Sequence, residues 1–374
     1  MDEPLRVALD ATPLLGRPTG VGAFCAGVLE GLARRQDVAA SAFAVSWRRR
    51  HLIDTRVPPG ITRCTRAMPA RPLHAAWRVV DAPALEWFVG AVQVVHGTNY
   101  VVPPTRSAAR VVTVHDLTTV RFPELCDRST LAFPTLVRRA LAGGAWVHTH
   151  SASVAAEVVE TFGADPARVR AVASGIPPLG EPDERAHLRY LPSGVTRYVL
   201  AVGTAEPRKD LPGLVAAFDL IAQARPDLGL VLAGPEGWGS AHLRRAIDAS
   251  SAKARVVVTG WIDDATLSGL LRHASVLAYP SLYEGFGYPP LQAMALGTPV
   301  VATRAGALEE VLADAALLVA PRDPEALAEA VSSVVDSEDV AAALRARGLA
   351  RAATFDWDTC AAGLVALYRD AAGR

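Results

Sequence analysis

Short apolar runs rich in β-branched residues alternate with longer helical patterns along the chain, and this alternation constrains the fold more than any other feature. In the first half these runs lie near 5–10, 41–46, 92–96, 110–114, 145–149 and 169–173, and in the second half near 197–203, 228–233, 255–259, 275–279, 299–302 and 316–319. Strands buried on both faces read as continuous apolar runs, as in parallel sheets with helical crossovers. The sequence therefore predicts an α/β protein.

The two series of runs predict two doubly wound domains. The periodicity fails over 176–195, a stretch rich in proline, glycine and charge, which is typical of a domain linker. We expect a Rossmann-like domain over 1–175, a linker and hinge over 176–195, and a second Rossmann-like domain over 196–352. The remaining segment, 353–374, predicts an amphipathic helix that packs back on the first domain.

Composition excludes several classes of protein. The 374 residues carry 38 basic and 38 acidic side chains, so no net field recruits nucleic acid. The four cysteines are widely spaced, which argues against a zinc site or a disulfide framework and favours a reducing compartment. The acidic N-terminus does not resemble a signal peptide, and no apolar run approaches the roughly 20 residues that span a bilayer. We expect a cytoplasmic protein.

The stretch YEGFGYPP, residues 283–290, places a carboxylate and two glycines between an apolar run and a helix start. Loops at the carboxyl ends of parallel strands form the ligand crevice of such sheets, and helix N-termini there attract phosphate. Gly285 and Gly287 would let backbone N–H groups approach a ligand. Glu284 would offer two oxygens to vicinal hydroxyls, as on a sugar. The alternative is a structural turn with a solvated glutamate.

A second loop, residues 201–211, follows the first apolar run of the second half. It holds Arg208 and Lys209 side by side before a helical pattern. This pair suits a diphosphate, because arginine binds phosphate oxygens through forked hydrogen bonds and lysine acts as a point charge. The alternative is a solvated basic pair.

These motifs, with AALLVAPRDPEALAEAV at 315–331, resemble the retaining glycosyltransferases of family 4. The resemblance extends over nearly the whole chain, through DATPLLGRPTGVGAF near the start and VVTVHDLTTVRFPE in the middle. It implies the GT-B fold, in which two Rossmann-like domains face each other across a central cleft. It also implies transfer of a hexose, mannose or glucose, from a nucleoside-diphosphate sugar to a hydroxyl acceptor in glycan, glycolipid or secondary-metabolite biosynthesis.

The resemblance assigns donor binding mainly to the second domain. Arg208 and Lys209 would hold the diphosphate, and Glu284 would hold hydroxyls of the donor sugar together with backbone amides of the same loop. The base would lie against residues 260–262. The full donor-binding set implied in this way is Gly20, Gly22, Arg208, Lys209, Gly260, Trp261, Ile262, Glu284, Gly285, Phe286, Gly287 and Gln292.

The chain departs from the family pattern at two places. The family usually has a second glutamate eight residues after the first, which binds the nucleotide ribose, and this chain has Gln292 there. An amide still pairs with a diol but lacks the charge-assisted strength, a loss of about 1 kcal/mol or more. Some relatives also carry an extra arginine where this chain has Gly203 or Thr204, so in this chain Arg208 would have to bind the diphosphate without it. These departures predict weaker ribose binding or a different nucleotide.

In the first domain, Gly20 and Gly22 would approach the diphosphate or the acceptor. The alternative, a nicotinamide-binding loop, is disfavoured because GVGAFC lacks the third glycine and lies about ten residues after the strand. His115 matches a family histidine beside the donor sugar, whereas a lone histidine at a strand end is otherwise a structural hydrogen-bonding residue.

We expect three further polar residues of the first domain on the acceptor side, with an ordinary polar loop as the alternative for each. They are Asn99, Tyr100 and Asp116.

The resemblance implies a front-face mechanism, in which the leaving phosphate helps to deprotonate the incoming hydroxyl. His115, Glu284, Arg208 and Lys209 would be the catalytic set, with the two cations stabilising the departing diphosphate. Hydrolytic glycosidases need two flanking carboxylates, and the sequence shows no such pair. We expect no cofactor and no metal ion, because the metal-binding DxD motif is typical of the other major transferase fold.

The segment 45–80 has many arginines and a single acid, Asp54, with Trp47 and Trp77 interspersed. This predicts a peripheral contact with an anionic membrane, at the inner face of a cytoplasmic membrane, or alternatively a solvated basic face. For the whole chain, two other functions stay open. One is a nucleotide-sugar epimerase of the same architecture, and the other is a non-catalytic nucleotide-sugar-binding subunit. The sequence leaves the oligomeric state open.

Overall fold

The computed structural model describes residues 3–16, 19–128 and 130–374, and the chain divides into two compact units. Unit 1 comprises Met1–Pro177 together with Phe355–Arg374, and unit 2 comprises Pro178–Thr354. The predicted linker 176–195 therefore has only its first two residues in unit 1. The last segment of the chain belongs to unit 1.

Within its described residues, unit 1 holds a seven-stranded sheet in the order β3-β2-β1-β4-β5-β6-β7. Every neighbouring pair is parallel. The strands are β1 Leu5–Asp10, β2 Val38–Phe43, β3 Thr62–Cys64, β4 Val94–Gly97, β5 Ala109–Thr113, β6 Trp146–Thr149 and β7 Val169–Ala171. Strand order reverses between β1 and β4, which is the kind of position at which open α/β sheets bind ligands.

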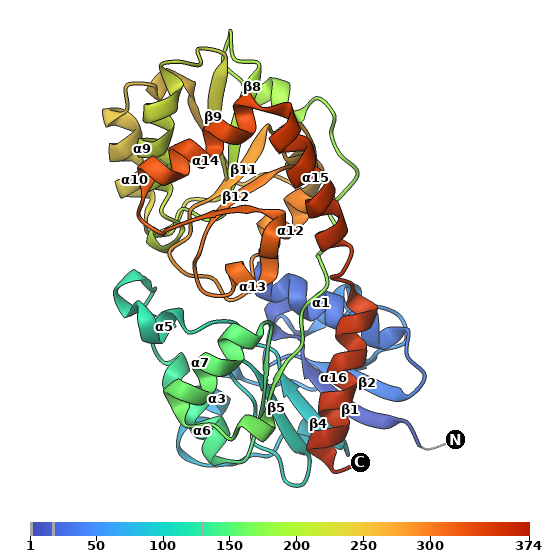
Figure 1. The fold of residues 1–374 in the computed structure, drawn as a ribbon. Helices are drawn as coiled ribbons and strands as arrows, with labels where there is room; N and C mark the ends of the chain where they lie inside the picture. Colours follow the sequence, from blue (N-terminus) through green and yellow to red (C-terminus); the bar gives the residue numbers. More distant parts are fainter. Residues whose placement is uncertain (1–2, 17–18, 129) are drawn as a thin grey trace. The chain divides into compact units, whose positions relative to one another are not determined.

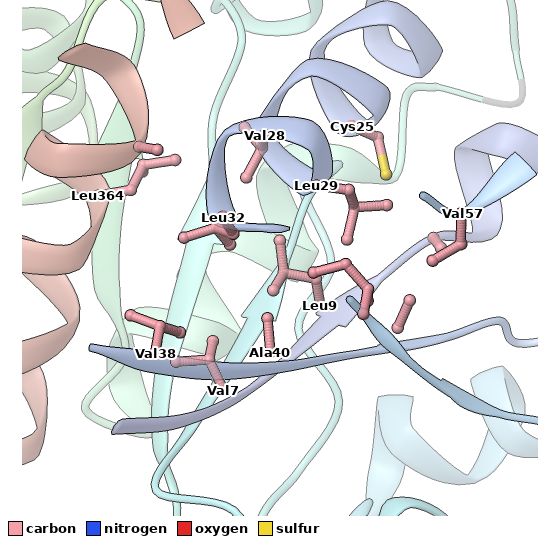
Figure 2. Packing of buried hydrophobic residues seen from close by; sticks show 14 of the residues in the cluster. Val7, Leu9, Cys25, Val28, Leu29, Leu32, Val38, Ala40, Val57 and Leu364 are labelled. Atoms are coloured by element: carbon pink, nitrogen blue, oxygen red, sulfur yellow. The ribbon is translucent and has the colours of Figure 1, made fainter. Parts of the chain in front are cut away.

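Helices lie on both faces of the unit 1 sheet. They are α1 Gly20–Ala33, α2 Ile53–Arg56, α3 Ala70–Val79, α4 Glu86–Val89, α5 Thr118–Arg121, α6 Phe133–Ala142, α7 Ala152–Phe162 and α16 Trp357–Ala372. Although α1 and α16 are far apart in sequence, they lie side by side (Figure 1). Leu364 of α16 shares a buried cluster with Val28 and Leu32 of α1 (Figure 2). The C-terminal helix is therefore part of the unit 1 core.

Unit 2, all of whose residues are described, holds a six-stranded sheet in the order β10-β9-β8-β11-β12-β13. These pairs are also parallel. The strands are β8 Arg197–Val202, β9 Leu228–Ala233, β10 Val256–Gly260, β11 Val276–Tyr279, β12 Val300–Thr303 and β13 Leu317–Val319. Here the strand order reverses between β8 and β11. The loops after these two strands carry the two motifs that the sequence predicts to bind a ligand.

The helices of unit 2 complete its layers. They are α8 Ala186–Tyr190, α9 Leu211–Ala222, α10 Ser240–Ala249, α11 Asp264–His273, α12 Tyr288–Ala295, α13 Leu308–Leu312, α14 Pro324–Asp336 and α15 Glu338–Ala352. Strand β9 is buried along its whole length, which explains its uninterrupted apolar sequence. Helix α8 forms inside the predicted linker and packs on α11.

The predicted fold class is confirmed, because both sheets are parallel with helices interspersed. Strand β3 was missed by the sequence analysis: it has only three residues, none of them buried, and so carries no apolar run. None of the described helices is both long and apolar enough to cross a bilayer.

Candidate functional site

The loop after β8 presents two cations at the switch point of unit 2. Residues Pro207–Lys209 form a single 3-10 turn, and Asp210 follows in the left-handed region at φ 44°. The Asp210 side chain then caps α9 by accepting a hydrogen bond from Gly213 N at 3.3 Å. This sequence of turn, reversal and cap holds Arg208 and Lys209 at the carboxyl edge of the sheet.

The loop after β11 presents Glu284 at the same edge. Ala307 N donates to Glu284 O at 2.8 Å, and a Cβ at Gly306 would lie 2.2 Å from that oxygen. Gly306 has φ 59°, so both its backbone conformation and its surroundings require glycine. Leu282 N also donates to Arg208 O at 2.8 Å. The two loops are therefore tied together through their backbones.

One carboxylate oxygen joins the predicted residues into a cluster. Glu284 Oε1 lies 2.7 Å from Arg208 Nη1 and 2.6 Å from Lys209 Nζ. Arg208 Nη1 also donates to Tyr283 O at 2.7 Å, and Arg208 Nη2 lies 3.4 Å from Glu206 Oε2. The structure thus brings three of the predicted residues, Arg208, Lys209 and Glu284, together at one edge of the sheet.

Burial sets the protonation states of this cluster. Burial alone would raise the pKa of Glu284, but the charges of Arg208 and Lys209 outweigh it and lower that pKa to about 2. Burial lowers the pKa of Lys209, and the Glu284 charge opposes the shift. The glutamate is therefore a carboxylate at all physiological pH values. An ionised carboxylate can hold two cations in place and still accept a hydroxyl hydrogen bond on its second oxygen.

The sequence analysis missed Tyr279, the last residue of β11, which contacts Lys209. Lys209 Nζ donates to Tyr279 Oη at 2.6 Å, and the ammonium lies 4.6 Å from the centre of the ring. Burial raises the pKa of Tyr279, so the phenol stays neutral. The available signal was a hydroxyl-bearing residue ending the otherwise aliphatic strand VLAY.

The other residues predicted from this motif lie between Glu284 and the middle of α12. Gly285, Phe286 and Gly287 are buried, and Gly287 has φ 106° as the residue that precedes α12. Gln292 is half-buried within α12.

The residues that the sequence predicts to contact the nucleotide base lie at the end of another strand, β10. Gly260 is the last residue of β10, and its carbonyl accepts from Gly234 N at 3.1 Å. Trp261 beside it is 62% exposed. These residues share the carboxyl edge of the sheet with the charged cluster, two strands away from β8.

Four predicted residues of unit 1 form a second polar group. His115 Nε2 donates to Thr98 O at 2.9 Å, and Tyr100 packs its ring 5.5 Å from the His115 ring. Asp116 N donates to Tyr100 Oη at 3.0 Å. Tyr100 has φ 55°, a rare conformation for a residue with a side chain. Asn99 precedes it and is half-buried.

His115 belongs to a chain of hydrogen bonds with a fixed direction. A carbonyl oxygen can only accept, so the His115 proton lies on Nε2, and Nδ1 accepts from His150 Nε2 at 2.7 Å. His150 Nδ1 in turn accepts from Ser174 Oγ at 2.8 Å. Both ring nitrogens of His115 are therefore engaged, and a contact of this ring with a donor sugar stays a prediction.

A second such chain runs beside the first. Tyr368 Oη donates to His96 Nδ1, His96 Nε2 to Thr113 Oγ1, and Thr113 Oγ1 to His148 Nδ1, at 2.7, 2.7 and 3.0 Å. His148 Nε2 ends the chain at Val172 O, 3.0 Å away. Burial lowers the pKa of His115 and of His148 to about 4, and it also lowers the pKa of His96 and of His150 well below the ordinary value of a histidine. The four imidazoles are neutral, as the direction of both chains requires.

The predicted glycines of α1 are placed differently from each other. Gly20 is exposed at the start of α1. Gly22 is buried, and its N–H donates to Thr19 Oγ1 at 3.1 Å as the helix cap. Residues 17–18, just before them, lie outside the described residues. Over the described ranges no group of three or more histidine, cysteine, aspartate or glutamate side chains is arranged to hold a metal ion.

Comparison with known proteins extends this result. The family described as Glycosyl transferases group 1 matches residues 189–351. O-antigen chain mannosyltransferase B of Escherichia coli is 29% identical over 280 residues, 73% of each chain. D-inositol 3-phosphate glycosyltransferase of Segniliparus rotundus is 30% identical over 315 residues, 80% of this chain and 68% of the relative.

Solved structures share the fold. A sucrose-phosphate synthase from Thermosynechococcus elongatus has a TM-score of 0.76 at 22% identity and covers 98% of both chains. HepE from Anabaena, in complex with UDP and glucose, has a TM-score of 0.73 at 17% identity, with 97% of this chain and 98% of that chain covered. Fold and relatives together define a GT-B glycosyltransferase. The chain belongs to the group 1 glycosyltransferases, the family that its sequence resembles.

We predict that Gly306→Ala displaces the Glu284 loop, because its Cβ would overlap Glu284 O. Gly194→Ala is the matched control, since Gly194 also has a positive φ, of 83°, but meets nothing within 4 Å. The control should lower the free energy of unfolding only by the backbone strain, about 1 kcal/mol. Gly306→Ala should lower it by at least twice as much. Urea unfolding measures both values. Equal losses would contradict the role of Gly306.

We predict that acid destabilises unit 1. A histidine in the unfolded chain has a pKa of about 6.5, whereas His115 and His148 have pKa values of about 4 in the folded protein. Stability is therefore full above about pH 6.5 and falls as pH drops toward 4, by about 2 kcal/mol per histidine between pH 7 and pH 5. Asp10 opposes this by about 1 kcal/mol, because burial raises its pKa to about 6.

Hydrogen exchange checks this prediction strand by strand. Amides of β4, β5 and β6 should lose protection between pH 7 and pH 5 after correction for intrinsic exchange rates, with amides of β8 and β9 as the internal control. Unchanged protection in unit 1 would contradict it.

Proposed function

We propose that this glycosyltransferase is a retaining enzyme that moves mannose or glucose from a nucleoside-diphosphate sugar to a hydroxyl acceptor. The observation that carries the proposal is the pairing of Arg208 and Lys209 on one oxygen of Glu284, at the switch point of unit 2. Ligands of open α/β sheets bind at this point. HepE, which shares the fold, has been solved with UDP and glucose, and curated relatives are named mannosyltransferases, which supports a nucleotide-sugar donor.

In the proposed donor complex each residue has a distinct task. Arg208 and Lys209 bind the diphosphate, and the second oxygen of Glu284 accepts hydrogen bonds from donor hydroxyls. The backbone of Phe286 and Gly287 binds beside it, and Gly260 to Ile262 lie against the base. Gln292 pairs with the ribose as a neutral amide, in place of a carboxylate.

The two cations also supply the main catalytic effect. When the glycosidic bond breaks, negative charge grows on the leaving diphosphate, and preorganised cations stabilise that charge more than they stabilise the intact donor. The leaving phosphate then takes the proton of the incoming hydroxyl on the same face of the sugar. We propose that this route needs no resident metal ion, because Arg208 and Lys209 would supply the positive charge that neutralises the phosphates. His115 near the donor, and Asn99, Tyr100 and Asp116 near the acceptor, are parts of the same proposal.

Nucleotide binding tests the donor site. Lys209 and Lys253 are the only lysines of the chain, which gives a matched pair of variants, Lys209→Met at the site and Lys253→Met on the surface. A ligand at 100 times its Kd adds about 2.7 kcal/mol to stability. We expect UDP or GDP, from a panel that includes ADP, to stabilise the wild type and Lys253→Met, and to stabilise Lys209→Met far less. Equal stabilisation of both variants would contradict the assignment.

Turnover separates the proposal from its alternatives. A transferase consumes the donor faster when an acceptor is present and releases the nucleoside diphosphate. An epimerase would convert the donor without releasing nucleotide, and a binding subunit would do neither.

We also propose a peripheral contact between unit 1 and an anionic membrane. Among the described side chains, no arginine between residues 48 and 71 lies within 4.0 Å of a carboxylate. Several of these arginines instead donate to backbone carbonyls, as Arg50 does to Thr65 O. Trp47 is 60% exposed, and Val79 at the end of α3 is 77% exposed. Unpaired positive charge beside exposed apolar side chains suits an anionic lipid surface.

Vesicle sedimentation tests this contact. The chain should sediment with phosphatidylglycerol vesicles at low salt, remain in solution with phosphatidylcholine vesicles, and be released by about 0.5 M salt. Replacing Arg48 and Arg49 by glutamine should weaken sedimentation. The control is Arg244→Gln, which changes an exposed arginine paired with Glu236 in unit 2. Absence of sedimentation at low salt would exclude the contact.

A further inference from the structure

Asp10 is a buried carboxylate at the switch point of unit 1. It is the last residue of β1, and the strand order of that sheet reverses between β1 and β4. Asp10 therefore stands at the kind of position where open α/β sheets bind ligands. Of the residues at this second switch point, Asn99 and Tyr100 have been proposed above to lie near the acceptor, and Asp10 has no assigned ligand.

The two oxygens of the Asp10 carboxylate differ in their surroundings. Oδ1 accepts from Thr12 N at 2.8 Å and from Thr12 Oγ1. Oδ2 receives no hydrogen bond from any described residue, and it is not sealed from solvent, although the residue is only 9% exposed. Burial raises the pKa of Asp10 to about 6, with the Thr12 hydrogen bonds opposing. Burying a carboxylate and leaving one oxygen unpaired is costly, and such groups are concentrated at functional sites.

The loop after β4 brings an asparagine to the same edge of the sheet as Asp10. Thr98 Oγ1 donates to Asp10 O at 2.6 Å and so ties the loop after β4 to the end of β1. The next residue, Asn99, is half-buried, and its side chain makes no hydrogen bond within the described part of the chain. Tyr100 follows at φ 55°, and a strained backbone of this kind often marks a ligand site.

We propose that Asp10 and Asn99 form a binding site for the hydroxyl groups of an uncharged, sugar-like acceptor. The proposal rests on the transferase function above and adds the class of the acceptor. A carboxylate oxygen accepts hydrogen bonds from hydroxyls, and a carboxamide both donates and accepts, which together match a vicinal diol. The same carboxylate repels a phosphate group, so acceptors that carry a phosphate at this position bind less well.

Paired acceptors test the proposal on the full chain. The probes are methyl α-D-mannopyranoside, methyl α-D-glucopyranoside and myo-inositol, each beside its phosphate ester, with the nucleotide sugar that the wild type hydrolyses. Transfer is followed by mass spectrometry, and donor hydrolysis in the absence of acceptor is measured in parallel. We expect the wild type to transfer to at least one neutral probe and to prefer it to the phosphate ester.

The variant Asp10→Asn keeps the shape of the side chain and removes its charge. We expect its KM for the neutral acceptor to rise about tenfold, its preference for neutral over phosphorylated acceptors to shrink, and its donor hydrolysis to stay within about twofold of the wild type. A merely structural role would not change the preference between the two acceptors. Asp370→Asn, on an exposed part of α16, is the control and should change none of these values.

Three results would overturn the inference. They are a wild-type preference for phosphorylated acceptors, an unchanged KM and preference in Asp10→Asn, and donor hydrolysis without transfer to any neutral probe. If the wild type neither binds nor hydrolyses any nucleotide sugar, the proposed function itself fails, and this outcome is distinct from the other three.

Discussion

The shared oxygen of Glu284 is the interaction on which the organisation of unit 2 depends. Arg208 and Lys209 repel each other, and both are largely removed from water. A single ionised carboxylate between them makes this arrangement stable without a ligand, whereas removal of one partner from a buried charge cluster is strongly destabilising. The cluster also joins the loops after β8 and β11, so the geometry of the site is set before any ligand arrives. Preorganisation of this kind reduces the cost of binding.

The interior of unit 1 is held by a different kind of polar contact. Two chains of hydrogen bonds run through four neutral imidazoles, and each ends at a backbone carbonyl, that of Thr98 or of Val172. Phe24 lies among these rings, stacked on His148 with centroids 5.4 Å apart. A fully satisfied polar network specifies one arrangement of its members. It therefore positions His115 and the end of β4 without using any charge.

The sequence predicts the fold well because buried parallel strands are continuous apolar runs. Each of the twelve predicted runs overlaps one strand of the two sheets, and the runs at β1 and β9 match at both ends. It predicts Arg208, Lys209 and Glu284 because each is a charged residue in a loop at a strand end. It could not predict that one oxygen of Glu284 pairs with both cations, nor that Tyr279 accepts a hydrogen bond from Lys209. Such contacts depend on the directions of side chains in the loops after β8 and β11, where Lys209 and Glu284 are 75 positions apart in the chain. For the same reason Asp10 reads as an ordinary strand end until its burial is known.

The placement of α16 has a consequence for how the protein is made. Leu364, Leu367 and Tyr368 are buried in unit 1, but they are synthesised after the whole of unit 2. Because domains form as the chain leaves the ribosome, the sheet of unit 1 must wait with an incomplete core while unit 2 is already able to fold. Until α16 is synthesised, His96 Nδ1 lacks its partner Tyr368 Oη, and the part of the core that α16 completes stays unfilled.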